Sequence, residues 1–106
     1  MILKVYSVFD SKTSLYSRPY FFITEAECIR TFGYLAAMDT QSMFHRHGED
    51  FVLFETGSYD DSTGVTTMLP AHRSVGVLLA LGASYLKLLP KQEVVDTTAP
   101  TFTSDI

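Results

Sequence analysis

Residues 50–69 read DFVLFETGSYDDSTGVTTML, and this stretch decides the fold because it contains every part of a β-hairpin. Residues 51–56 and 65–69 are rich in aromatic and β-branched side chains, which favour strands. The residues between them, 57–64, are rich in Gly, Ser and Asp, which favour turns. The pattern predicts a hairpin with a long, acidic tip.

The first predicted strand of this hairpin has apolar side chains on both faces. Phe51 and Leu53 point one way, whereas Val52 and Phe54 point the other way, because side chains alternate along a strand. We expect Phe54 to lie in the core. Two strands alone are not stable in water, so another part of the chain must cover the hairpin.

The N-terminal segment supplies further strands. Residues 2–9 carry apolar side chains on both faces, which is typical of a central strand. Residues 10–14 have the composition of a turn. Residues 20–23 are apolar again and are expected to bring the chain back beside the first strand, with Pro19 at the edge.

The sequence Thr24-Glu25-Ala26-Glu27 predicts the start of a helix, because it has the pattern of a capping box. Thr24 is expected to cap the helix, and Glu27 is expected to accept a hydrogen bond from the Thr24 amide. The helix should end near Met38, and Gly33 should allow close approach to a strand. Its apolar side chains recur at helical spacing: Cys28, Ile29, Phe32, Leu35 and Ala36. This stripe predicts that the helix covers the sheet.

The C-terminal third is less clear. Pro70 is expected to end the second hairpin strand. Residues 75–86, VGVLLALGASYL, fit either a buried helix or a strand; we favour a helix over residues 74–86, with Ser74 as its cap. Residues 90–106 have little to bury and are predicted to be a flexible tail. The sequence therefore predicts one α+β domain over residues 1–89, with an antiparallel sheet and two helices.

Composition limits the classes of function. The chain has 106 residues and a formal net charge of −4, which speaks against a broadly basic nucleic-acid surface. It has no signal peptide pattern and no apolar run of about 18 residues, so we expect a cytosolic protein without membrane contact. The single cysteine, Cys28, permits no internal disulfide and is expected to be a buried thiol.

The common motifs of catalysis are not in the sequence. It contains no glycine-rich phosphate loop, nucleophile elbow, HExxH motif or cysteine pair, so neither an enzyme nor a cofactor is expected. His45 and His47, with His72 as a distant third, have a spacing that suits a metal ion in an extended segment. Surface histidines are the favoured interpretation, because no cysteine pair supports a site. Residues 60–64 lack the ligand spacing of a calcium loop.

Aromatic and basic residues alternate near the N-terminus, and this mixture is typical of surfaces that hold single-stranded nucleic acid. The candidate residues are Lys4, Lys12, Tyr16, Arg18, Tyr20, Phe22 and Arg46. The alternative is that the aromatic members simply form core, and the residues alone favour it. These candidates include only a few cations. If the protein binds DNA, homo-oligomerisation would therefore have to repeat this small basic surface along the strand.

A second candidate surface is acidic. Residues 48–69 contain five carboxylates and no Lys or Arg. Asp60 and Asp61 at the hairpin tip could therefore bind a protein partner without any contact with DNA.

Three segments together resemble a known group of proteins. They are VYSVFDSK at residues 5–12, PYF at residues 19–21 and FHRHGEDFVLFETGSYD at residues 44–60. Their order and spacing resemble the small nonstructural proteins of gokushovirus-type microviruses, which are single-stranded DNA phages, over residues 3–74. The resemblance implies single-stranded DNA binding in the cytoplasm of the infected bacterium, linked to the switch from duplex replication to single-strand synthesis. For the alternative, it implies that Asp60 and Asp61 bind a host or phage replication protein.

Overall fold

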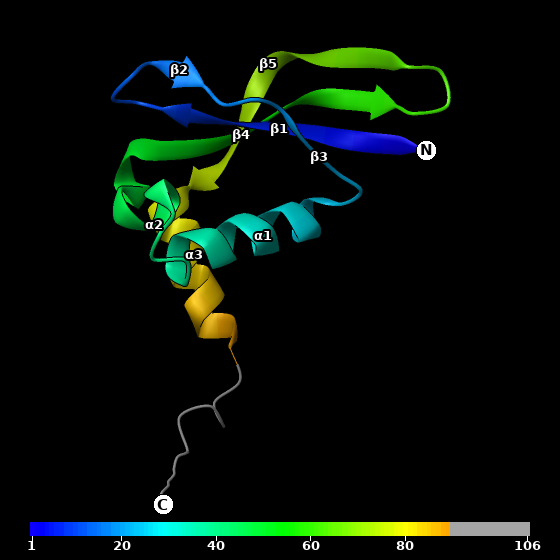
Figure 1. Cartoon of the computed structure of the whole chain (residues 1–106). Helices are drawn as coiled ribbons and strands as arrows, with labels where there is room; N and C mark the ends of the chain where they lie inside the picture. Colours follow the sequence, from blue (N-terminus) through cyan, green and yellow to red (C-terminus); the bar gives the residue numbers. More distant parts are fainter. Residues whose placement is uncertain (90–106) are drawn as a thin grey trace, which may run out of the picture.

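The predicted hairpin is present in the computed structural model, which describes residues 1–89 (Figure 1). Its strands are β4 (Phe51–Asp60) and β5 (Val65–Val77), paired antiparallel. The turn between them is only residues 61–64, with Gly64 at a φ of 76°. The tip is shorter than predicted because residues 57–60 continue the strand instead of forming a loop.

The hairpin belongs to a five-stranded antiparallel sheet. Strand β1 (Ile2–Asp10) pairs with β4 along one edge, and with β2 (Leu15–Tyr16) and β3 (Tyr20–Phe22) along the other. The strand order is β2-β1-β4-β5, with β3 also beside β1. The predictions that β1 is central and that the chain returns beside it are confirmed.

All helices lie on one side of the sheet (Figure 1). The two main ones are α1 (Glu25–Ala37) and α3 (Leu78–Leu88), which pack against each other. The core between helices and sheet consists of Tyr6, Val8, Cys28, Phe32, Ala36, Leu53 and Leu78. The apolar stripe of α1 therefore covers the sheet as predicted, and the α+β class is confirmed.

Helix α1 begins as its capping pattern predicts. The Oγ1 atom of Thr24 accepts a hydrogen bond from the amide of Glu27 at 3.2 Å. The carboxylate of Glu27 reaches back to the amide of Ile23, at 3.3 Å, and not to that of Thr24 as we expected. At the other end, Met38 is the C-cap and donates its amide hydrogen to the carbonyl of Tyr34.

Two glycines allow α1 and α3 to approach closely. A Cβ atom on Gly33 would lie 3.0 Å from the Cβ of Tyr85, and one on Gly82 would lie 3.0 Å from the Cβ of Ala36. The close approach predicted at Gly33 is therefore to a helix, and the expectation of a strand there is wrong.

Two predictions about β5 and α3 are also wrong. Strand β5 does not end at Pro70, because residues 69–72 form a bulge opposite Thr56 alone, where the missing amide hydrogen of proline costs no ladder bond. Ser74 lies in the strand and caps nothing; α3 starts at Leu78, after Val77, without a side-chain cap. The ambiguous apolar segment is thus strand first and helix afterwards.

The connection from α1 to β4 contains two short helices, α2 (Met43–Arg46) and η1 (Gly48–Asp50). Phe44 on α2 packs its ring 5.7 Å from Phe32 and 5.1 Å from Phe51. Within residues 1–89 no helix has both the length and the apolar character needed to cross a membrane. The predicted tail, residues 90–106, lies outside the described residues.

Candidate nucleic-acid interface

The sheet has a second face, opposite the helices, and we call it the open face. Phe9 and Phe54 point to it, because they alternate with the buried core residues Val8 and Leu53. Phe54 is only half-buried there, so the prediction that it lies in the core is wrong. The core residue at this point of β4 is its neighbour Leu53, which is fully buried.

Four rings meet on the open face, and each comes from a different strand. Tyr16 is at the centre, with ring centroids 4.9 Å from Phe9, 5.4 Å from His72 and 6.0 Å from Phe54. Phe54 and His72 are 6.3 Å apart. We call these four residues the ring cluster. Tyr16 is 48% exposed, so the cluster presents aromatic surface to solvent and not only to itself.

Aromatic surface continues along the open face towards the hairpin turn. The rings of Phe21 on β3 and Tyr59 on β4 are 5.6 Å apart. Tyr59 and Phe54 share a face because a β-bulge inserts Thr56 between the β4 partners of Val5 and Tyr6. The open face is therefore lined with rings at both ends of the sheet.

The segment around β2 is tied firmly to β1 through Ser17. The amide of Ser17 donates to the carbonyl of Val8 at 2.8 Å, and its Oγ atom accepts from the amide of Val8 at 2.9 Å. The hydroxyl of Ser7 donates to the carbonyl of Ser17 at 2.8 Å. These bonds fix the backbone between Tyr16 and Arg18.

Two of the candidate cations lie in the same segment as Tyr16. Arg18 is exposed and forms no ion pair within residues 1–89. Lys12 lies in the turn before β2, with its Nζ atom 3.8 Å from Asp50. Lys12, Tyr16 and Arg18 therefore lie in the turn, strand β2 and the residues directly after it, beside the Phe9 end of β1.

The other candidates lie elsewhere. Tyr20 and Phe22 turn towards α1, with ring centroids 5.1 Å and 6.2 Å from Phe32. Arg46 is on α2, where its Nε atom donates to the carbonyl of Thr40 at 3.4 Å. These positions are away from the ring cluster, and a binding role for these residues stays a prediction.

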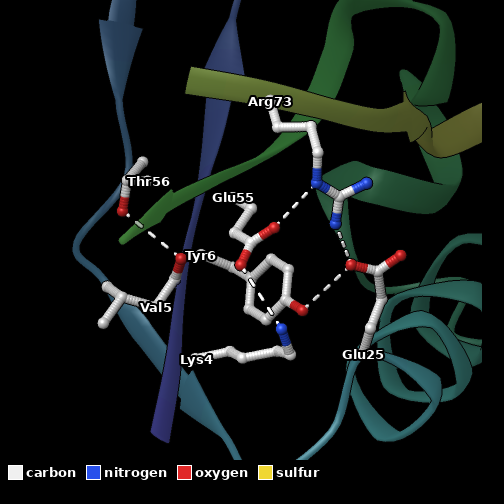
Figure 2. A network of polar contacts seen from close by, with 7 residues as sticks. All are labelled: Lys4, Val5, Tyr6, Glu25, Glu55, Thr56 and Arg73. Atoms are coloured by element: carbon white, nitrogen blue, oxygen red, sulfur yellow. Dashed lines mark hydrogen bonds and ion pairs between the residues drawn. The ribbon is translucent and has the colours of Figure 1, made fainter. Parts of the chain in front are cut away.

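Lys4 belongs to a polar network on the helix side (Figure 2). Its Nζ atom is 3.6 Å from Glu55, which also accepts a hydrogen bond from the Nε atom of Arg73 at 2.7 Å. Arg73 donates to Glu25 on α1 as well, and the hydroxyl of Tyr6 donates to the same carboxylate at 3.2 Å. The hydrogen bond with Glu55 raises the pKa of Arg73, and burial raises the pKa of Tyr6. The network ties β5 to α1.

The acidic tip is engaged by its own chain. The amine of Met1 donates to Asp61 at 2.8 Å and lies 3.9 Å from Asp60. Asp60 also accepts a hydrogen bond from the amide of Ser62 at 2.9 Å. The hydrogen bond with Asp61 raises the pKa of the amine.

The three histidines do not come together. His45 places its Nδ1 atom 2.8 Å from the carbonyl of Ala36, whereas His72 is part of the ring cluster. Among residues 1–89 there is no group of three or more His, Cys, Asp or Glu side chains arranged to hold a metal ion.

Residues 3–81 match the family described as Phage ORF5 protein. The chain belongs to this family. The matched residues include all five strands except Ile2 at the start of β1, and they include the whole ring cluster of this phage protein. No curated protein and no solved structure matches the chain.

Sequence reasoning found Tyr16 but missed its three partners in the ring cluster. Phe9, Phe54 and His72 come from segments far apart in the chain, and only the strand order brings them together. The alternation of Phe54 with Leu53 was the signal that could have found one of them.

Proposed function

We propose that this phage protein binds single-stranded DNA on the open face of its sheet, in the cytoplasm of the infected bacterium. We further propose that binding serves the switch from duplex replication to single-strand synthesis, as the resemblance to microvirus nonstructural proteins implies. The observation that supports binding is the ring cluster, because exposed aromatic rings on a sheet are a common platform for stacked bases.

The distribution of charge on the sheet is compatible with a phosphate backbone, despite the net charge of −4. Glu55, the acidic residue in the middle of β4, points to the helix side, where it pairs with Lys4 and Arg73. Lys12 and Arg18 flank the segment that carries Tyr16. Two cations release few counterions, so stacking must supply most of the affinity and salt should weaken binding only moderately.

Stacking also predicts the type of selectivity. Every base has a π face, so a platform of rings tolerates different sequences. We propose sequence-tolerant binding of single strands without catalysis and without a cofactor. Duplex DNA, whose bases are already stacked and paired, should bind more weakly.

The test is a titration of a fluorescent oligonucleotide with the wild-type protein and two matched variants. Tyr16→Ala should weaken binding about 5- to 150-fold, which corresponds to the loss of one stacked base. Tyr34→Ala is the control, because Tyr34 is also 48% exposed but lies on α1, away from the open face. The proposal fails if both variants bind like the wild type, or if micromolar wild-type protein leaves the oligonucleotide unbound at low salt.

A further inference from the structure

The two edges of the sheet differ in how they are protected. One edge consists of the short strands β2 and β3, with Pro19 between them. The other edge is β5, whose outer side has no strand beside it within the described residues. Short strands and proline are the usual devices that prevent an edge from pairing with another chain.

The first part of β5 carries none of these devices. Residues 65–69, VTTML, contain no charge and no proline, and they belong to the types that favour strands. Val65 and Met68 are each 56% exposed, and the two threonines between them are exposed as well. Protection begins only at Pro70, in the bulge. An uncharged, exposed edge of this kind is a template for a further strand.

We propose that the strand it accepts is the same edge of a second copy of this chain. Two identical edges that pair around a two-fold axis run antiparallel, and each residue meets its counterpart symmetrically. The uncharged run is centred on Thr67, so Thr67 would lie opposite Thr67 of the second copy. Thr66 would then lie opposite Met68 of the second copy, and all three residues belong to the regular part of β5. Cross-strand threonine pairs are favourable in sheets.

The acidic turn favours this direction. Asp60 and Asp61 lie just before the start of β5, so antiparallel pairing places the acidic turns of the two copies at opposite ends of the interface. Parallel pairing would instead place the two acidic turns side by side, and like charges repel.

The geometry also sets the arrangement of the two faces. In an antiparallel pair the two-fold axis is perpendicular to the sheet, so both helix layers lie on one side and both ring clusters on the other. The pairing itself does not depend on DNA. If the proposed function is also right, which this step assumes, one strand of DNA can contact two ring clusters, and binding gains from two linked sites.

Cysteine cross-linking without DNA tests the register. Residues directly opposite in an antiparallel pair have Cα atoms about 4.5–5.5 Å apart, which a disulfide can bridge. Thr67→Cys should therefore form a disulfide between two copies of the protein when oxidised glutathione is added as the oxidant. Glutathione takes up the two electrons and the two protons that the thiols lose. Cys28 should not react, because burial raises the pKa of its thiol to about 12.

Val65→Cys is the matched control, on the same edge and similarly exposed. In the proposed register its two copies are about 13 Å apart, from four residues at roughly 3.3 Å each, so it should not cross-link. Thr66→Cys combined with Met68→Cys should cross-link, because these two positions lie opposite each other in the proposed register. The register is wrong if Val65→Cys alone forms dimers as readily as Thr67→Cys.

Sedimentation equilibrium tests the interface itself. Wild-type protein should have twice the chain mass of 11.9 kDa, and Thr67→Lys should have the single mass, because two ammonium groups would lie opposite each other. Thr31→Lys adds the same charge to an exposed position on α1 and should stay dimeric. A monomeric wild type, or a dimer unaffected by Thr67→Lys, overturns the proposal. Neither result depends on whether DNA is bound.

Discussion

Neighbouring residues of the same strands lie on opposite faces of the sheet and differ in burial. On the helix side, Leu53 and Tyr6 are fully buried beneath α1 and α3. On the open face, Phe54 and Phe9 rest on the rings of Tyr16 and His72, and no helix among residues 1–89 covers them. The difference shows that residue type does not decide whether a ring on a strand belongs to the core. The position of the helix layer decides it.

The largest expected effect is on stability, and it should differ between substitutions on the two faces of the sheet. Leu53→Ala should lower the free energy of unfolding by about 2–5 kcal/mol, because it leaves a cavity in the core. Phe54→Ala should lower it by only about 1–2 kcal/mol, because the ring is half-buried. Urea unfolding followed by circular dichroism measures both. A larger loss for Phe54→Ala would mean that the open face is covered in solution.

The next effect is on DNA affinity, where a substitution on the open face should matter most. Phe54→Ala should weaken the affinity for single-stranded DNA by about 1–3 kcal/mol, because a stacking ring is lost. Phe54→Tyr keeps the ring and should bind like the wild type. The affinity is measured by fluorescence anisotropy, at a temperature where both variants are folded. Equal affinity of Phe54→Ala and Phe54→Tyr would remove this ring from the site.

A smaller effect belongs to the helix side alone. Thr24→Ala should cost about 1 kcal/mol of stability, because it removes the acceptor for the amide of Glu27. Thr24→Ser keeps a hydroxyl and should recover most of the loss. Thermal and urea unfolding give the change in stability, and DNA affinity should stay constant. A change in affinity for Thr24→Ala would connect the capped helix to binding and break the separation of the two faces.

The smallest effect concerns charge. Arg18→Ala should reduce the slope of log affinity against log salt concentration by about 0.7, the value for one phosphate contact on a single strand. Arg30→Ala is the control, since Arg30 is exposed on α1 and has no ion pair within the described range. Titrations at several salt concentrations give both slopes. If the two variants have the same slope, Arg18 does not contact the phosphate backbone.

Much of the fold was predictable because its signals are local. The hairpin and the Thr24 cap each depend on a few adjacent residues, and both are confirmed. The errors at Pro70 and Ser74 have one cause, the bulge at residues 69–72, which places proline where no ladder bond is needed and lets the strand continue. A bulge depends on the partner strand, so the segment alone does not reveal it.

The candidate site was less predictable, because it depends on which face of the sheet each side chain points to. The alternation of aromatic and basic residues pointed to Tyr16 and to the cations beside it. The same pattern included Tyr20 and Phe22, which the pairing of β3 with β1 turns towards the core. The bulge at Thr56 changes which residues of β4 share a face. Strict alternation of side chains along β4 therefore assigns the residues after Thr56 to the wrong face.

The position of β1 at the centre of the sheet has a consequence for the order of events during synthesis. β1 is translated first, yet its partner β4 follows roughly 2–12 s later at 5–20 residues per second. β2 and β3 are close in sequence and can pair with β1 in the meantime, whereas the β4–β5 hairpin forms locally within microseconds. Docking of that hairpin onto β1 should therefore be slower than these local steps, because it closes the long loop formed by residues 11–50.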